Sequence, residues 1–149
     1  MKDFGFDHSL PMILNRALDS VMPLYRELFA RYGLTDQQWR ILRVVWTHDK
    51  VNSVDLSHRT LLATASLVGI IDRLEKKDLV SRIRSSDDRR AVYIIATAKS
   101  RELEAEVNPQ VVAIQSRVRS IVSDKEWAAM EKTLQKVSNA LASDHDKQV

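Results

Sequence analysis

The stretch SVDLSHRTLLATASLVGIIDRLEKKDLVSRIRSSDDRRAVY, residues 53–93, decides how this chain folds. Its apolar spacing predicts a short helix over residues 54–61, with Ser53 as the expected N-cap, then a sharp turn and a second helix over residues 64–77. Two alternating segments, 79–83 and 91–96, predict short strands joined by a charged loop. The stretch therefore predicts a pair of helices followed by a β-hairpin.

The second predicted helix has one apolar side and one outward side. Its outward positions are Thr64, Ser66, Val68, Gly69 and Arg73. Thr64 and Ser66 are small polar residues at the start of a helix, where side chains can meet base edges of DNA. Glycine in mid-helix costs about 1 kcal/mol relative to alanine. Gly69 therefore indicates close approach of another molecule, for which a DNA backbone or base is one candidate.

The spacing in this stretch resembles the winged helix-turn-helix of the MarR family of bacterial transcription regulators. Upstream, the segment LTDQQW at 34–39 is similar to the start of the helix that precedes this motif in the family. Segments 38–41 and 66–70 are most similar to family members that regulate aromatic-acid catabolism. The matching residues are Leu56, Ser57, Arg59, Leu62, Ser66, Leu67, Ile71, Asp72, Arg73, Leu74, Glu75, Leu79, Val80, Arg82, Asp88, Arg89 and Arg90.

Four positions depart from the family pattern. Leu61, Asp78 and Ser100 stand where glycine is common, and Ala63 stands where the second helix often has a serine N-cap. We expect Thr64 to cap that helix with a shift of one residue. We also expect Asp78 to adopt the left-handed conformation, which aspartate tolerates better than most residues.

The charged loop over residues 84–90 is the predicted wing. The resemblance implies that its D-x-R, here Asp88 and Arg90, sends an arginine into the minor groove, where narrow A·T-rich stretches concentrate negative potential. Arg84 and Arg89 complete the predicted DNA contacts of the wing. The alternative interpretation is an ordinary solvated charged loop.

The first predicted helix runs over residues 9–32, with Pro23 expected to kink or end it. Arg16 lies close to its apolar face, and two interpretations stay open. It is either a surface arginine whose stem covers apolar surface, or an anchor for a ligand carboxylate. The resemblance adds weight to the second, because several aromatic-acid responders in the family use an arginine in this helix.

A capping box at residues 35–38 predicts the start of the next helix, 36–47. Trp39 and Trp46 share one stripe of that helix and are either core residues or walls of an aromatic-ligand pocket. Arg43 lies nearby, either as part of a solvated flank or as part of the pocket. The candidate ligand set is therefore Arg16, Trp39 and Arg43.

Two long helical patterns end the chain, one over 97–120 with an expected kink at Pro109 and one that starts from a capping box at Ser123. Together with the first helix they carry more apolar surface than a small winged domain covers, which favours a homodimer. The predicted fold is mostly α with a small β-hairpin wing. A winged helix-turn-helix over 35–97 is flanked by dimerisation helices, 1–34 and 98–149.

Composition restricts the remaining classes. The chain has 149 residues, about one domain's worth, with 44% hydrophobic and 29% charged residues and no cysteine. Its formal net charge of +3 permits DNA binding without requiring it. We find no signal peptide and no apolar run long enough to span a membrane, so we expect a cytoplasmic protein without membrane contact. No motif supports a cofactor, a metal site or a catalytic residue, so an enzyme is the class we expect least.

Two functions remain. The first is a ligand-responsive transcriptional regulator, in the role of a repressor, which binds a pseudo-palindromic double-stranded DNA operator as a homodimer and is released by a small aromatic carboxylate or related phenolic compound. The second is a winged-helix architectural or protein-interaction module without a small-molecule effector. Arginines at the wing favour the first, and salt-dependent, sequence-selective DNA binding separates the two.

Overall fold

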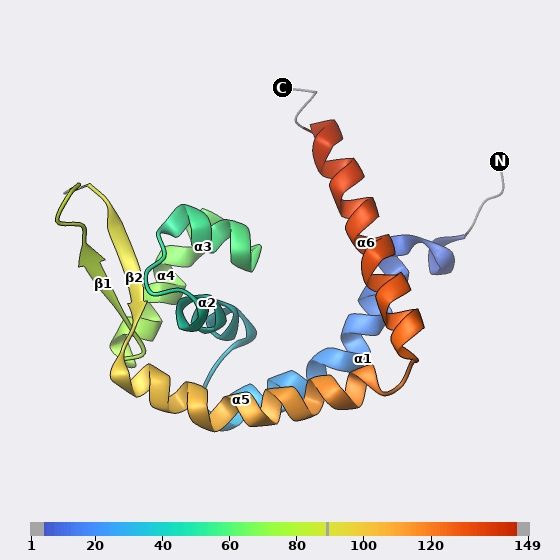
Figure 1. The fold of residues 1–149 in the computed structure, drawn as a ribbon, viewed down its shortest axis with the longest axis horizontal. Helices are drawn as coiled ribbons and strands as arrows, with labels where there is room; N and C mark the ends of the chain where they lie inside the picture. The colour runs from blue at the N-terminus through green and yellow to red at the C-terminus, as the bar shows by residue number, and fades with distance from the viewer. Residues whose placement is uncertain (1–4, 89, 146–149) are drawn as a thin grey trace. The chain divides into compact units, whose positions relative to one another are not determined.

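The computed structural model describes residues 5–88 and 90–145, and Arg89 of the predicted DNA-binding set lies outside them. The fold is mostly helical with one antiparallel hairpin, as predicted (Figure 1). The chain forms two compact units, one up to Val111 and one from Val112 onward. Its elements are a 3₁₀ helix at Phe6–His8, α1 (Leu10–Arg31), α2 (Asp36–Thr47), α3 (Ser53–Thr60), α4 (Thr64–Lys76), β1 (Val80–Arg84), β2 (Val92–Ala96), α5 (Ala98–Arg119) and α6 (Asp124–His145).

Local capping signals set the end of α1 and the start of α2. Helix α1 does not end at Pro23 but continues to Arg31. Gly33 then adopts a positive φ of 65°, and its N–H donates to the Ala30 carbonyl at 3.0 Å. A left-handed glycine of this kind satisfies carbonyls that the last helical turn leaves unpaired. The predicted capping box at the start of α2 is confirmed, since Thr35 and Gln38 exchange backbone and side-chain hydrogen bonds, both 3.1 Å long.

The start of α3 differs from the prediction. Its N-cap is Asn52, whose side-chain oxygen accepts the Asp55 N–H at 2.8 Å. Ser53, which we predicted as the cap, is the first helical residue instead. Asn52 has the extended backbone that an N-cap needs, and its carboxamide reaches the third N–H of the helix.

The turn between α3 and α4 also differs from the prediction. Thr64 does not cap α4, because the N-cap is Ala63 and no side chain accepts a hydrogen bond there. The Thr64 hydroxyl donates instead to Ser57 Oγ at 3.4 Å, across the turn to α3. Leu61 closes α3 in the left-handed conformation, with φ of 57°. Helices α3 and α4 bend by 102° at this break, as in a helix-turn-helix.

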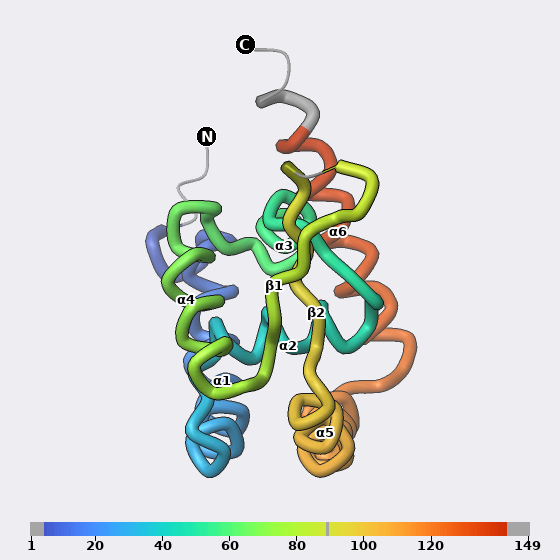
Figure 2. Tube along the Cα trace, turned by 90° about the vertical axis from the view of Figure 1, so that its left-hand side faces the viewer, coloured from blue at the N-terminus to red at the C-terminus, as the bar shows by residue number. Residues whose placement is uncertain are grey.

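The hairpin follows α4 after Asp78, which has φ of 59° and so adopts the predicted left-handed conformation. Strands β1 and β2 pair in antiparallel register from Val80↔Ala96 to Arg84↔Val92. An isolated β-bridge beside the hairpin was not predicted: Val51 exchanges two backbone hydrogen bonds with Ile94. Strand β1 lies beside α4 and β2 lies beside α2 (Figure 2).

The core of this unit is built on aromatic stacking between α1 and α2. The Phe29 ring stacks on Trp39 with centroids 4.5 Å apart, and Trp39 meets Trp46 edge-on at 5.3 Å. Both tryptophans are buried. Of the two interpretations left open for them, core packing is therefore present in this protomer.

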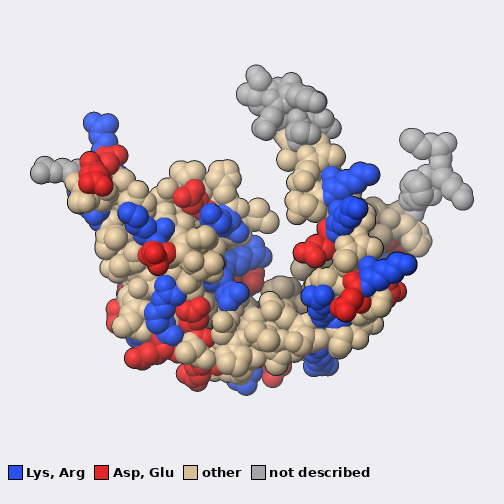
Figure 3. Space-filling view, in the orientation of Figure 1, with Lys and Arg blue, Asp and Glu red and all other residues tan. Residues whose placement is uncertain are grey.

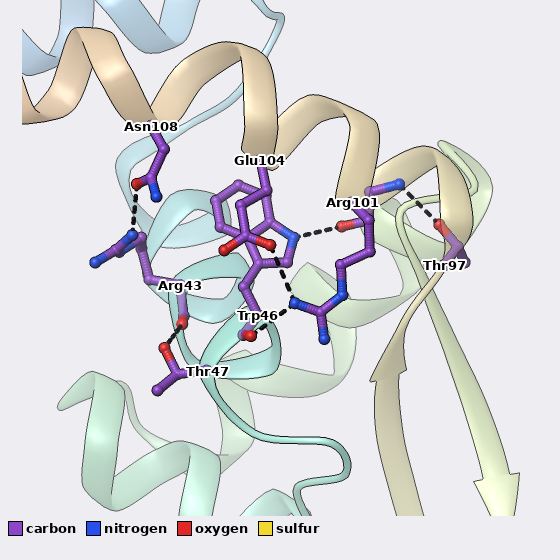
Figure 4. A network of polar contacts seen from close by, with 8 residues as sticks. Arg43, Trp46, Thr47, Thr97, Arg101, Glu104 and Asn108 are labelled. Atoms are coloured by element: carbon purple, nitrogen blue, oxygen red, sulfur yellow. Dashed lines mark hydrogen bonds and ion pairs between the residues drawn. The ribbon is translucent and has the colours of Figure 1, made fainter.

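Ser100 explains one departure from the family pattern. It is fully buried, and its Oγ accepts the Trp46 indole N–H at 2.8 Å. Arg101 strengthens the same joint between α2 and α5, because its guanidinium donates to the Trp46 carbonyl at 2.6 Å (Figure 4). A glycine at position 100 would leave the indole without this acceptor.

Ser100→Ala should lower the free energy of unfolding by about 1–3 kcal/mol, the cost of leaving a buried donor unpaired. Chemical denaturation measures this loss. In the Trp46→Phe background the same substitution should cost much less, because no indole N–H remains to be satisfied. Equal losses in the two backgrounds would show that the hydrogen bond is not the cause.

The unit from Val112 onward contains the end of α5 and all of α6. Its predicted capping box is confirmed, since the Glu126 carboxylate accepts the Ser123 N–H at 2.8 Å and the Ser123 hydroxyl at 2.6 Å. These hydrogen bonds lower the pKa of Glu126 from its ordinary value. Large apolar side chains of this unit are exposed, namely Val112, Ile121, Val122, Met130 and Leu141.

Candidate nucleic-acid interface

Helix α4 presents the outward face that its sequence predicts. Leu67, Ile70, Ile71 and Leu74 are buried and hold the helix against the core. All five predicted DNA-contacting positions on this helix are exposed, namely Thr64, Ser66, Val68, Gly69 and Arg73. A Cβ added at Gly69 would meet nothing within 4 Å in the part of the chain that the structure describes, so packing there does not require glycine.

The wing tip is shaped by two side chains. Ser85 Oγ accepts the N–H groups of Asp87 and Asp88, at 3.2 and 3.3 Å. The Asp88 carboxylate accepts the Arg90 N–H at 2.9 Å. Asp88 is thus placed to hold the turn that presents Arg90. Among the residues that the structure describes, the exposed guanidinium groups of Arg84 and Arg90 have no hydrogen-bond or ion-pair partner.

Arg82 has a different place from the other hairpin arginines. Its guanidinium pairs with Asp72 at 2.7 Å and with the Glu75 carboxylate, both on α4. The Arg82 backbone N–H also donates to Glu75, at 3.1 Å. The sequence pattern did not predict this role of Arg82. Two carboxylates three positions apart on a helix were the available signal. This cluster, Asp72–Glu75–Arg82, fixes the base of the hairpin to α4.

The charge around this face is mixed. Residues 53–93 carry eight Lys or Arg and six Asp or Glu, an excess of only two. Figure 3 shows the two signs interspersed over the unit that contains the hairpin. Because Arg82 is already paired, attraction for a polyanion depends on cations that have no side-chain partner among the described residues, such as Arg73, Arg84 and Arg90.

The three predicted ligand residues do not gather in this protomer. Arg16 pairs with Asp7 at 2.5 Å, and both side chains are more than half exposed. The Arg43 guanidinium lies 6.0 Å from the Trp39 ring centroid and donates to Asn108 at 2.7 Å. Arg16 precedes Phe29, the stacking partner of Trp39, by 13 residues of α1, which is about 20 Å along a helix. A single site that uses all three needs groups from a second chain.

Residues 5–88 and 90–145 show neither a group of metal ligands nor a single membrane-spanning helix. No group of three or more His, Asp or Glu side chains there is placed to hold a metal ion. No single described helix is long and apolar enough to cross a membrane, and α3 and α4 reach such a length only together, across their bend.

The bent helix pair, the outward face of α4 and the hairpin fixed beside it define a winged helix-turn-helix DNA-binding protein. A model of the MarR family matches residues 34–92. The chain is 34% identical over 103 residues to the HTH-type transcriptional regulator FarR of Neisseria gonorrhoeae, which covers 69% of this chain and 70% of that protein. The chain belongs to the MarR family of transcriptional regulators, whose members bind DNA as dimers.

Other relatives agree with this assignment. The homoprotocatechuate degradative operon repressor of Escherichia coli is 33% identical over 103 residues, with 69% of this chain and 70% of that protein covered. The crystal structure of NadR in complex with 4-hydroxyphenylacetate is 27% identical, with a TM-score of 0.77 and coverage of 92% and 97%. The repressor CouR bound to a 23-mer DNA duplex shares the fold at 22% identity, with a TM-score of 0.80 and coverage of 93% and 99%.

Proposed function

We propose that this chain is a homodimeric, effector-responsive transcriptional repressor that binds a pseudo-palindromic operator. The observation that supports this proposal is that two candidate DNA-contacting surfaces, the outward face of α4 and the wing, lie on the same unit. The outward face of α4 is exposed. The wing, where Arg84 and Arg90 have no side-chain partner among the described residues, is anchored to the same helix by the Asp72–Glu75–Arg82 cluster. Helix α4 enters the major groove of each half-site, and the wing reaches the adjacent minor groove.

The two surfaces have different tasks. Thr64, Ser66, Val68, Gly69 and Arg73 lie against base edges and the nearby backbone, so they set sequence preference. Arg84, Arg89 and Arg90 supply positive charge along the minor groove. Asp88 holds the wing turn in shape for them rather than approaching DNA with its own negative charge.

Arg90→Ala should weaken binding to all sequences and lower the salt slope of log K by about one unit, because one phosphate-neutralising charge is lost. Ser66→Ala should instead change which operator variants are preferred. Fluorescence anisotropy on duplexes selected from a random-sequence library measures both effects. Arg31→Ala, which removes an exposed arginine of α1, is the charge control and should leave the slope unchanged. Failure to select any duplex would favour the protein-interaction module instead.

Gly69→Ala should separate folding from DNA binding. Alanine is favoured over glycine inside a helix by about 1 kcal/mol, and the added Cβ meets no atom of the described residues within 4 Å. The melting temperature should therefore rise by a few degrees. Operator affinity should fall, because the same methyl group obstructs close approach of α4 to the groove. A variant that is more stable and binds DNA as well as the wild type would show that DNA does not approach at Gly69.

The homodimer is supported by apolar surface left exposed on α1. Four large apolar residues at spacings of three and four, Leu10, Ile13, Leu14 and Leu18, are exposed over its first half. One helical stripe of this kind favours burial against another chain. The exposed apolar residues of the unit from Val112 onward offer a second such surface.

The effector is a small aromatic carboxylate. This proposal rests on the relatives, because one represses a homoprotocatechuate operon and another was crystallised with 4-hydroxyphenylacetate. Arg16, Trp39 and Arg43 are the proposed contacts, with a guanidinium on the carboxylate and the indole beside the ring. Since Arg16 is remote from Trp39 within one protomer, the site draws Arg16 from the partner subunit or is built around Arg43 alone.

A titration with 4-hydroxyphenylacetate distinguishes these two arrangements. The compound should raise the melting temperature and weaken operator binding, with a coupling of about 1–3 kcal/mol. If both arginines hold the carboxylate, Arg16→Ala and Arg43→Ala should each abolish the response while operator affinity stays near that of the wild type. Loss only in Arg43→Ala assigns the site to one chain. An unchanged response in both variants would overturn the proposed ligand set.

A further inference from the structure

Val68 is an apolar side chain that the fold does not account for. It lies on the outward side of α4 with 60% of its surface exposed, so it adds little to the core. Valine is also among the weaker helix formers, because its branched Cβ loses rotamer freedom against the preceding turn. Neither packing nor helix propensity therefore explains a valine at this position.

The other residues of the first two turns of α4 limit what the helix can recognise. Residues 64–72 contain no Asn, Gln, Lys or Arg, the side chains that form paired hydrogen bonds to purine edges. Arg73, in the third turn, is the first residue of that kind. An apolar side chain in the major groove has one specific partner among the bases, the 5-methyl group of thymine.

We propose that Val68 reads a thymine 5-methyl group in each operator half-site and is a specificity-determining residue of the DNA interface. The inference rests on the proposed insertion of α4 into the major groove. Thr64 lies one turn earlier on the same side of the helix. Val68 thus selects an A·T pair of defined orientation at the position it faces, by apolar contact rather than by hydrogen bonding.

Deoxyuridine tests the contact, because it keeps every hydrogen-bonding group of thymine and lacks only the methyl group. The probe is the tightest duplex that the wild-type protein selects from a random-sequence library. Each thymine of one half-site is replaced in turn by deoxyuridine, and affinity is measured by fluorescence anisotropy. For the wild type, at least one replacement should weaken binding by about fourfold, the effect of losing one buried methyl-sized group.

Val68→Ala should remove the penalty at that thymine and keep the penalties at other positions. The control is Val54→Ala, which shortens another exposed valine of the same unit, on α3, and should keep the wild-type pattern. Wild-type binding that is indifferent to every replacement would overturn the proposal, as would an unchanged pattern in Val68→Ala. Either result leaves the proposed function intact, whereas selection of no duplex at all would contradict that function itself.

Discussion

Ile13→Glu combined with Leu14→Glu should convert the protein to a monomer and lower operator affinity by about 100-fold or more. Both residues belong to the exposed apolar stripe of α1. Burying each against a partner contributes about 1.5–3 kcal/mol, and a charge in its place adds a desolvation cost. A monomer offers one recognition helix instead of two, so binding to both half-sites is lost.

Sedimentation velocity at micromolar concentration measures the change in assembly, and fluorescence anisotropy measures the change in affinity. Circular dichroism should stay close to that of the wild type, because both side chains are already exposed in the protomer. Val54→Glu is the matched control for assembly, since it charges an exposed apolar residue on α3 and should remain dimeric. A double variant that still sediments as a dimer would place the interface elsewhere.

Arg82→Ala should weaken operator binding by about tenfold or more, although we place Arg82 away from the DNA. Two consequences follow from the loss of its guanidinium. The hairpin loses its anchor on α4, and Asp72 and Glu75 become an unneutralised acidic pair on the DNA-facing helix itself. Like charges at this spacing repel each other, and both repel phosphate.

Neutralising the acidic pair distinguishes the two consequences. If repulsion dominates, Asp72→Asn with Glu75→Gln in the Arg82→Ala background should restore much of the affinity at low salt. If the loss of wing anchoring dominates, affinity should stay low and the wing should become more sensitive to proteolysis. Wild-type affinity in Arg82→Ala itself would contradict the positioning role of the cluster.

Local signals account for the parts of the fold that the sequence predicted well. Helix α2 begins at the predicted residue because the Thr35–Gln38 capping box, which lies within four positions, determines its start. The same holds for the end of α1, where Gly33 supplies a left-handed residue. Periodic apolar residues then fix which face of α4 is buried, and with it the outward set.

Features that depend on distant residues were not predicted. The Val51–Ile94 bridge joins positions 43 residues apart, and nothing in 48–52 marks a strand. The Trp46–Ser100 hydrogen bond joins residues that are 54 positions apart in the sequence. It gives Ser100, which stands where the family often has glycine, a buried partner. Arg82 could not be assigned from its type, because an arginine beside a charged loop suits DNA and an acidic pair equally well.

One local signal was ambiguous. The N-cap of α3 is Asn52 and not the predicted Ser53, because both residue types are good N-caps.

In the proposed complex, two copies of α4 lie in successive major grooves, each with its wing beside it. Hydroxyl-radical footprinting of the wild-type protein on its selected duplex tests this most directly. We expect two protected segments per strand, related by two-fold symmetry and centred about 10 base pairs apart, flanked by minor-groove protection that Arg90→Ala removes. A single protected segment, or flanking protection that persists in Arg90→Ala, would contradict it.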